Sequence, residues 1–171
     1  MSPCRRADLR QVQVELVQSV TGGDCPPGFD RRQIALTAAS LRTKRYRTVV
    51  RTWPVLSEAL GERFEVLFDR YARSSRPPSH GGALADGRRF IRVLAEENLL
   101  TDAIRLAALS VDLRWTDHPE GLVRRRRPAI RAVRLRESPA WVIAVWFPRS
   151  GERRLVFRRP RLGRSVSLTS R

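Results

Sequence analysis

The sequence predicts a mainly α protein: a bundle of about six helices followed by a small C-terminal three-stranded antiparallel β-sheet. Apolar residues recur at helical spacing from residue 7 to about residue 116. Beyond that point the apolar pattern alternates at every second residue or becomes continuous, which is typical of strands. No sequence repeat stands out, so the pattern favours a bundle over a repeat protein.

The first two expected helices lie on either side of a break at TGGDCPPG. Residues 7–20 carry apolar side chains on one helical face, at Leu9, Val12, Leu16, Val17 and Val20. Asp30 can cap a second, long helix, which must end before Pro54. Its expected apolar stripe, set among basic residues, consists of Ile34, Ala38, Ala39, Leu41, Tyr46, Val49, Val50 and Trp53.

Four further helices follow. A short third helix begins at Pro54, because proline suits a first turn, and ends at Gly61. The fourth places four large residues on one face, namely Phe64, Leu67, Phe68 and Tyr71. After a loop rich in proline and glycine, we expect Asp86 to cap a fifth helix, whose apolar residues are Phe90, Ile91 and Leu94. A sixth runs from about Thr101 to Trp115, with Ile104, Ala107, Ala108, Val111 and Trp115 inside.

The last third of the chain is expected to form the sheet. A charged connector, TDHPEGLVRRRRP, leads to strands at residues 130–136, 140–147 (AWVIAVWF) and 153–158, with a turn at PRSG. So small a sheet must pack on the helices to be stable. The expected organisation is a helical domain (1–116), a basic connector (117–128), a β-sheet region (129–160) and a flexible tail (161–171).

The charge is strongly positive and unevenly placed. The formal net charge is +17, and Lys44 is the one lysine among the 34 basic residues. Residues 1–116 carry 19 basic and 13 acidic groups, whereas residues 117–171 carry 15 and 4. Such a balance favours polyanionic partners, nucleic acid or acidic polypeptide, although a GC-rich genome produces the same arginine bias.

The N-terminal sequence and the cysteines favour the cytoplasm. The start, MSPCRRADLR, has no apolar segment of the kind found in secretion signals, so Cys4 and Cys25 are expected to be free thiols. No apolar run approaches the ~20 residues that span a bilayer.

The search for catalytic and metal-binding motifs is mostly negative. His80 and His118 lie in expected loops without a metal-ligand spacing, and the group Asp117, His118 and Glu120 is typical of a turn. No nucleophile motif or phosphate loop is present in the sequence. We therefore expect no catalytic residue, no cofactor and no metal.

The candidate binding residues lie in the last third. The run Arg124, Arg125, Arg126 and Arg127 is the strongest signal for a polyanion. In the strand that follows, Arg134 and Arg136 share one face, and Arg131 adds a further positive charge. Trp141 and Trp146 have opposite parity on the next strand, so either both faces of the sheet are covered or one tryptophan marks a binding surface.

Six short motifs in the helical region occur in a recognisable order: KRYR (44–47), TWPVL (52–56), LGERF (60–64), FDRYA (68–72), RPP (76–78) and DGRRF (86–90). Over about residues 8–116 the chain resembles the N-terminal domain of the HvfC/BufC family, once catalogued as a DNA-binding domain, and especially its short actinobacterial members. The matching positions resemble fold determinants: Tyr46, Trp53, Pro54, Gly61, Phe64, Tyr71 and Phe90.

The resemblance implies a non-catalytic partner of a multinuclear iron-dependent oxidase of TIM-barrel type. Such partners help to present a ribosomal precursor peptide for cysteine modification. An exposed edge of the small sheet can accept an extended peptide, and arginines attract an acidic one. The alternative is a DNA-binding transcriptional regulator that uses the arginine-rich last third, although no helix-turn-helix is evident. A stand-alone enzyme is a third possibility, for which the sequence offers no residues.

Overall fold

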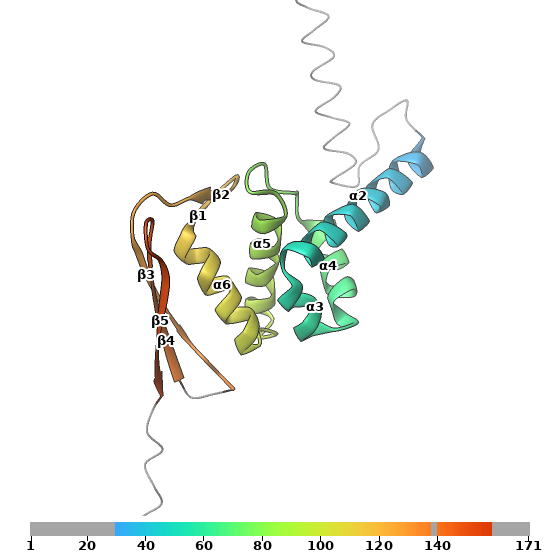
Figure 1. The fold of residues 1–171 in the computed structure, drawn as a ribbon. Coiled ribbons are helices and arrows are strands. Elements are labelled where there is room, and N and C mark those ends of the chain that lie inside the picture. Colours follow the sequence, from blue (N-terminus) through green and yellow to red (C-terminus); the bar gives the residue numbers. More distant parts are fainter. Residues whose placement is uncertain (1–29, 138–139, 159–171) are drawn as a thin grey trace, which may run out of the picture.

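The computed structural model describes residues 30–137 and 140–158, which form five α-helices followed by two small antiparallel sheets (Figure 1). A mainly α protein with a small antiparallel sheet is confirmed. The expected helix at 7–20, both cysteines and the tail at 161–171 lie outside the described residues. The elements are α2 (Arg31–Thr52), α3 (Pro54–Leu60), α4 (Arg63–Ser74), α5 (Gly82–Glu96), α6 (Asp102–Arg114), β1 (Trp115–His118), β2 (Gly121–Arg124), β3 (Ala129–Arg134), β4 (Ala140–Phe147) and β5 (Gly151–Arg158).

The ends of α2 and α3 follow the expected local rules. The Asp30 side chain accepts a hydrogen bond from the Arg32 backbone N–H at 2.8 Å and caps α2. Trp53 separates the two helices, and Pro54 occupies the first position of α3. Gly61 then ends α3 with φ = 55°, a conformation that glycine adopts without strain. The helix boundaries predicted from capping residues are confirmed here.

The start of α5 differs from the prediction. The helix begins at Gly82, after Gly81 in a left-handed conformation, so Asp86 lies inside it and is not its cap. Asp86 is only 3 % exposed and forms an ion pair with Arg45 of α2. The prediction failed because the neighbouring residues do not distinguish a capping aspartate from a buried one whose partner is distant in the sequence.

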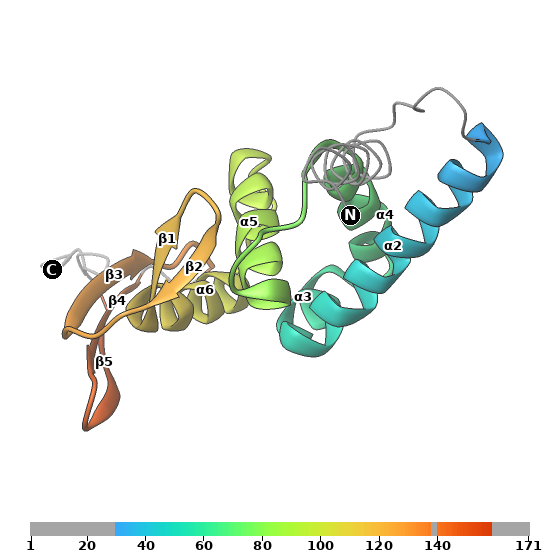
Figure 2. The same ribbon diagram turned by 90° about the horizontal axis from the view of Figure 1, so that it is seen from above.

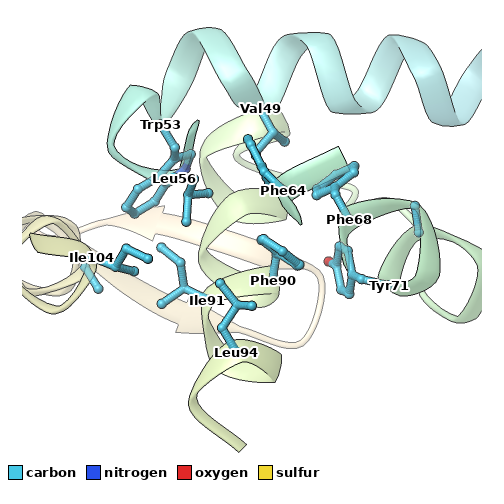
Figure 3. Packing of buried hydrophobic residues seen from close by; sticks show 12 residues of the cluster. Val49, Trp53, Leu56, Phe64, Phe68, Tyr71, Phe90, Ile91, Leu94 and Ile104 are labelled. Carbon is cyan, nitrogen blue, oxygen red and sulfur yellow. The ribbon is translucent and has the colours of Figure 1, made fainter. Parts of the chain in front are cut away.

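The core of the helical bundle is rich in aromatic side chains (Figure 3). Phe64, Phe68 and Phe90 are each at most 1 % exposed, and their ring centroids lie 5.3–6.0 Å apart. Such ring pairs stabilise by about 0.5–1.5 kcal/mol beyond the burial of their area. Trp53 closes one side of the core and Tyr71 another. The aromatic residues are therefore structural, as the helical spacing indicated.

Helix α6 connects the bundle to the sheet. Ile104 and Ala108 belong to the bundle core, whereas Leu109 and Leu113 belong to a second core with Val142, Ala144 and Trp146. Figures 1 and 2 show α6 between α5 and the strands. Because α6 has an apolar face on each side, the sheet packs on the bundle, as its small size requires.

The strands form two sheets instead of the single expected one. The three-stranded sheet has the order β3-β4-β5, and the predicted strand at 140–147 coincides with β4. The expected connector contains a separate hairpin, in which β1 pairs with β2 and Trp115 lies opposite Arg124. The hairpin escaped prediction because its strands, WTDH and GLVR, have four residues each, which is too short to show the alternation of a strand.

A tight contact holds this hairpin against the bundle. His80 bridges to Gly121, and the His80 backbone N–H donates to the Glu120 carbonyl at 3.0 Å. A Cβ at position 121 would lie 1.9 Å from the His80 carbonyl oxygen, so only glycine fits there.

No described helix combines the length and the apolar character needed to cross a membrane.

Candidate functional site

The outer face of the three-stranded sheet, which points away from α6, carries several large apolar side chains that are exposed. The register places Trp141 opposite Arg134 of β3, and Ile143 between Ala132 of β3 and Leu155 of β5. Exposed fractions on this face are 51 % for Trp141, 60 % for Leu155, 63 % for Ile130 and 42 % for Phe147. A group of large apolar side chains left open to water is typical of an interaction surface.

The two tryptophans of β4 have different surroundings. Trp146 is 6 % exposed and packs in the second core, whereas Trp141 is half exposed on the outer face. The parity of the strand therefore buries Trp146 against α6 and leaves Trp141 exposed on the outer face.

Both outer strands of this sheet have an open side. Within the described residues β3 and β5 each pair only with β4. An unpaired strand edge presents backbone N–H and carbonyl groups that can bind another extended chain. Arg134 on β3 and Arg153 on β5 are exposed and lie on the outer face beside the apolar residues.

The arginine run does not act as one cluster. Arg124 and Arg126 line an open hollow of about 540 Å³ with Val123, Trp146 and Pro148. Arg125 also touches this hollow, but its Nε donates to the carbonyls of Asp112 and Trp115, both at 3.2 Å. Thus Arg125 secures the junction of α6 and the hairpin.

The remaining predicted arginines also separate. Arg127 is exposed. Arg136 is exposed and donates to the Asn98 side chain at 3.3 Å, while its backbone N–H donates to Asp102 at 2.7 Å. Arg131 has the opposite parity to Arg134, and it lies on the side of β3 that faces the helices. The structure thus brings together Arg134 and Trp141, and separately Arg125 and Arg131.

Sequence reasoning missed a second group of arginines on α5 and α6. Arg88 and Arg92 lie one turn apart on α5, and together with Arg105 of α6 they line a groove against β3. Arg88 makes a bidentate ion pair with Asp112 at 2.7 Å. This hydrogen bond raises the pKa of Arg88 above its ordinary value. The sequence does hold a signal for this pair: Arg88 and Arg92 are four residues apart, a spacing that puts two side chains on one helical face.

A cavity of about 490 Å³ lies at the other end of the bundle, between α2, α5 and the loop before α5. Its walls include Leu41, Pro77 and Ala83, and Arg45 and Asp86 pair at its floor. None of the nine predicted residues lies there. Because Arg45 and Asp86 satisfy one another, the floor of the cavity offers a ligand little polar recognition.

Asp117, His118 and Glu120 of the hairpin each make a separate contact and do not form one acid–base group. Asp117 pairs with Arg92 at 2.5 Å, whereas the Glu120 carboxylate lies 3.1 Å from His80 Nε2. His118 Nδ1 accepts from the Glu120 backbone N–H at 3.4 Å. Among residues 30–137 and 140–158, no group of three or more His, Cys, Asp or Glu side chains is arranged to hold a metal ion.

Comparison with known proteins gives one match. A family model described as "SCO6045-like, C-terminal domain" matches residues 10–96. No curated protein and no solved structure matches the chain. The matched residues include α2, α3, α4 and α5 and end before α6.

Proposed function

The chain belongs to the SCO6045-like C-terminal domain family over residues 10–96, and we propose that it is a binding scaffold for peptide-modifying chemistry performed by another protein, with the helices supporting a C-terminal sheet that makes the contact. The motifs that resemble HvfC/BufC, from Lys44 to Phe90, lie inside the matched range. The proposed role is that of a non-catalytic partner of a multinuclear iron-dependent TIM-barrel oxidase. In this role the chain helps to bind or present a ribosomal precursor peptide.

The observation that carries the proposal is the outer face of the three-stranded sheet. Trp141, Leu155 and Ile130 are all at least half exposed there, although each has the size and apolarity of a core residue. Clustered aromatic and aliphatic anchors with arginines at the rim have the composition of a protein-binding surface. In contrast, the aromatic rings and the Arg45–Asp86 ion pair of the helices are buried in the bundle, where they stabilise the fold.

The open edges of β3 and β5 supply the mode of binding. An extended peptide can add as a further strand, so that its backbone is recognised by hydrogen bonds and its alternate side chains meet the outer face. Arg134 and Arg153 would attract acidic residues of that peptide and increase the rate of association. A peptide with alternating apolar and acidic residues fits this surface best.

Co-expression with a multinuclear iron-dependent TIM-barrel oxidase tests the partnership. We expect a stable complex to co-purify, and we expect the double change Arg134→Glu, Arg136→Glu to weaken peptide binding because it reverses charge beside the outer face. A matched control is Arg47→Glu, Arg51→Glu, which changes the same charge on exposed positions of α2. Failure to co-purify with any such oxidase would argue against the proposal.

DNA binding is the second candidate, favoured by the exposure of Arg124, Arg126 and Arg127 in one segment. Binding that is tight and sequence-dependent in a mobility shift at physiological salt would support a regulator. Weak binding that disappears with modest salt would reduce these arginines to a nonspecific charge effect.

A further inference from the structure

A second basic site lies where α5, α6 and β3 meet, on the side of the sheet opposite to Trp141. Two adjoining cavities of about 240 and 180 Å³ share Arg88, Arg92, Asp112 and Arg131. Arg105 lines the first of them, and Arg125 and Asp117 line the second. We call this continuous feature the arginine groove.

The arginine groove carries more positive charge than its own acids can balance. Five arginines line it, against the two aspartates Asp112 and Asp117. Arg88 pairs with Asp112, and Arg92 pairs with Asp117. The other three, Arg105, Arg125 and Arg131, have no ion pair to a carboxylate among the described residues.

The hydrogen bonds of these three arginines leave donors available. Arg125 uses Nε for two backbone carbonyls, and Arg131 uses one terminal nitrogen for the carbonyl of Ile130 at 3.1 Å. Arg105 Nε is buried, and within the described part of the chain it has no hydrogen-bond partner. A buried polar group without a partner costs about 1–3 kcal/mol, which a bound acceptor would recover.

We propose that the arginine groove binds a phosphate group, either as the free ion or as the phosphate of a small phosphorylated molecule. Arginine recognises phosphate by forked hydrogen bonds. A single carboxylate cannot neutralise the three positive charges of the groove that are unpaired among the described residues. A phosphate monoester neutralises more of them, because its charge at neutral pH is about −1.5 to −2. This site does not depend on the peptide-binding role: it rests on the excess charge of the groove and on the Nε of Arg105, which has no partner among the described residues.

Occupancy of the groove would also strengthen the junction between the bundle and the sheet. Its arginines come from α5 (Arg88), α6 (Arg105) and β3 (Arg131), so one bound dianion contacts three elements. A ligand that binds only the folded state stabilises it by RT ln(1 + L/Kd), where L is the ligand concentration, so the unfolding temperature rises with that concentration.

The test is isothermal titration calorimetry of the full chain with inorganic phosphate in a chloride buffer of fixed ionic strength. We expect saturable binding to one site, weakened about tenfold or more by Arg131→Ala, since hydrogen bonds to charged groups are strong. Arg134→Ala is the matched control, because it removes the same charge from the outer face of the same strand. It should change the affinity less than about twofold, which is the scale of a distant charge screened by salt.

Thermal unfolding with and without phosphate gives the second readout. At the same concentration, phosphate should raise the unfolding temperature of the wild type and of Arg134→Ala by similar amounts, and that of Arg131→Ala or Arg92→Ala by clearly less. Equal losses in Arg131→Ala and Arg134→Ala, or binding that never saturates, would overturn the proposal in favour of general charge. Tighter binding of glutamate than of phosphate at equal ionic strength would overturn it in favour of a site for acidic side chains.

Discussion

Asp86 of α5 accepts two hydrogen bonds from the guanidinium of Arg45 on α2, at 2.9 Å from Nε and 2.8 Å from Nη2. The Tyr71 hydroxyl donates to the same carboxylate at 2.9 Å, and Arg45 Nη1 donates to the Ser75 carbonyl at 2.9 Å. Burial, followed by the negative charge of Asp86, raises the pKa of Tyr71. One buried ion pair therefore joins α2, α4 and α5.

Asp86→Ala should be among the most destabilising single changes in the bundle. It leaves the Arg45 guanidinium, whose side chain is 15 % exposed, without its carboxylate. Breaking one side of a buried ion pair costs about 3–5 kcal/mol. Chemical denaturation followed by circular dichroism measures this loss.

Asp69→Ala is the control for that change. Asp69 pairs with Arg42 and Arg73, but its side chain is 41 % exposed. An exposed pair contributes about 0–1 kcal/mol, so the control should remain close to the wild type. If the two variants lost similar amounts of unfolding free energy, burial of the Arg45–Asp86 pair would not make it more stabilising than an exposed pair.

Gly87→Ala should destabilise the bundle, although alanine normally favours a helix interior by about 0.5–1 kcal/mol over glycine. A Cβ at position 87 would lie 2.3 Å from Cδ1 of Trp53, whose indole N–H donates to the Leu84 carbonyl. The ring would have to move and that hydrogen bond would be strained. Measured by denaturation, the change should cost much less in a Trp53→Leu background, because the clash is then removed. Equal costs in both backgrounds would rule out the clash.

The helical elements were largely predictable because their signals are local. Asp30, Pro54 and Gly61 define helix ends through the backbone of adjacent residues, and the predicted boundaries agree with the structure. Asp86 and Arg45 carry no such local signal. Their pairing depends on α2 and α5 lying side by side, so the sequence predicted Asp86 as a cap and gave no sign of its partner Arg45.

The candidate site was predictable only in part, for the same reason. Alternation along β4 correctly separated Trp141 from Trp146. The arginine groove joins residues as distant as Arg88 and Arg131, and their meeting depends on how α6 packs between the bundle and the sheet. The hairpin, which adds Asp117 to the groove and leads into Arg125, has strands of four residues each, too short to show an alternating pattern.

Docking of the sheet on α6 should weaken in acid through Glu152. Burial alone would raise the pKa of this carboxyl, but hydrogen bonds from Arg154, Arg114 and Ser110 lower it below its ordinary value. The stabilisation it provides is therefore present above the unfolded pKa of about 4.3 and is lost as the pH falls through the lower folded value.

Glu152→Gln tests this linkage in a series of denaturation curves from pH 7 to pH 3. The variant should be less stable at pH 7 and should show a shallower loss of stability in acid than the wild type. Glu58→Gln, at an exposed position of α3, is the control and should follow the wild type. A wild-type slope in Glu152→Gln would mean that other carboxyl groups cause the acid sensitivity.

The two tryptophans of β4 should respond to substitution in opposite ways. Trp146→Ala removes a side chain that is 6 % exposed and should cost about 3–5 kcal/mol of stability. Trp141→Ala removes one that is 51 % exposed, so it should cost under about 1 kcal/mol but weaken peptide binding at least tenfold if Trp141 is an anchor. Urea denaturation and peptide titration separate the two effects. Unchanged peptide affinity in Trp141→Ala would show that the outer face does not bind the peptide through Trp141.

Hydrogen exchange of the backbone amides, read by mass spectrometry, tests the central claim most directly. The protein is compared alone and with a synthetic peptide that alternates apolar and acidic residues, the pattern that fits the outer face. Peptide addition to a strand edge predicts new protection in β3 or β5, with little change in α2, α3 and α4. No new protection in either strand at a saturating peptide concentration would contradict the claim that the open sheet is the peptide-binding surface.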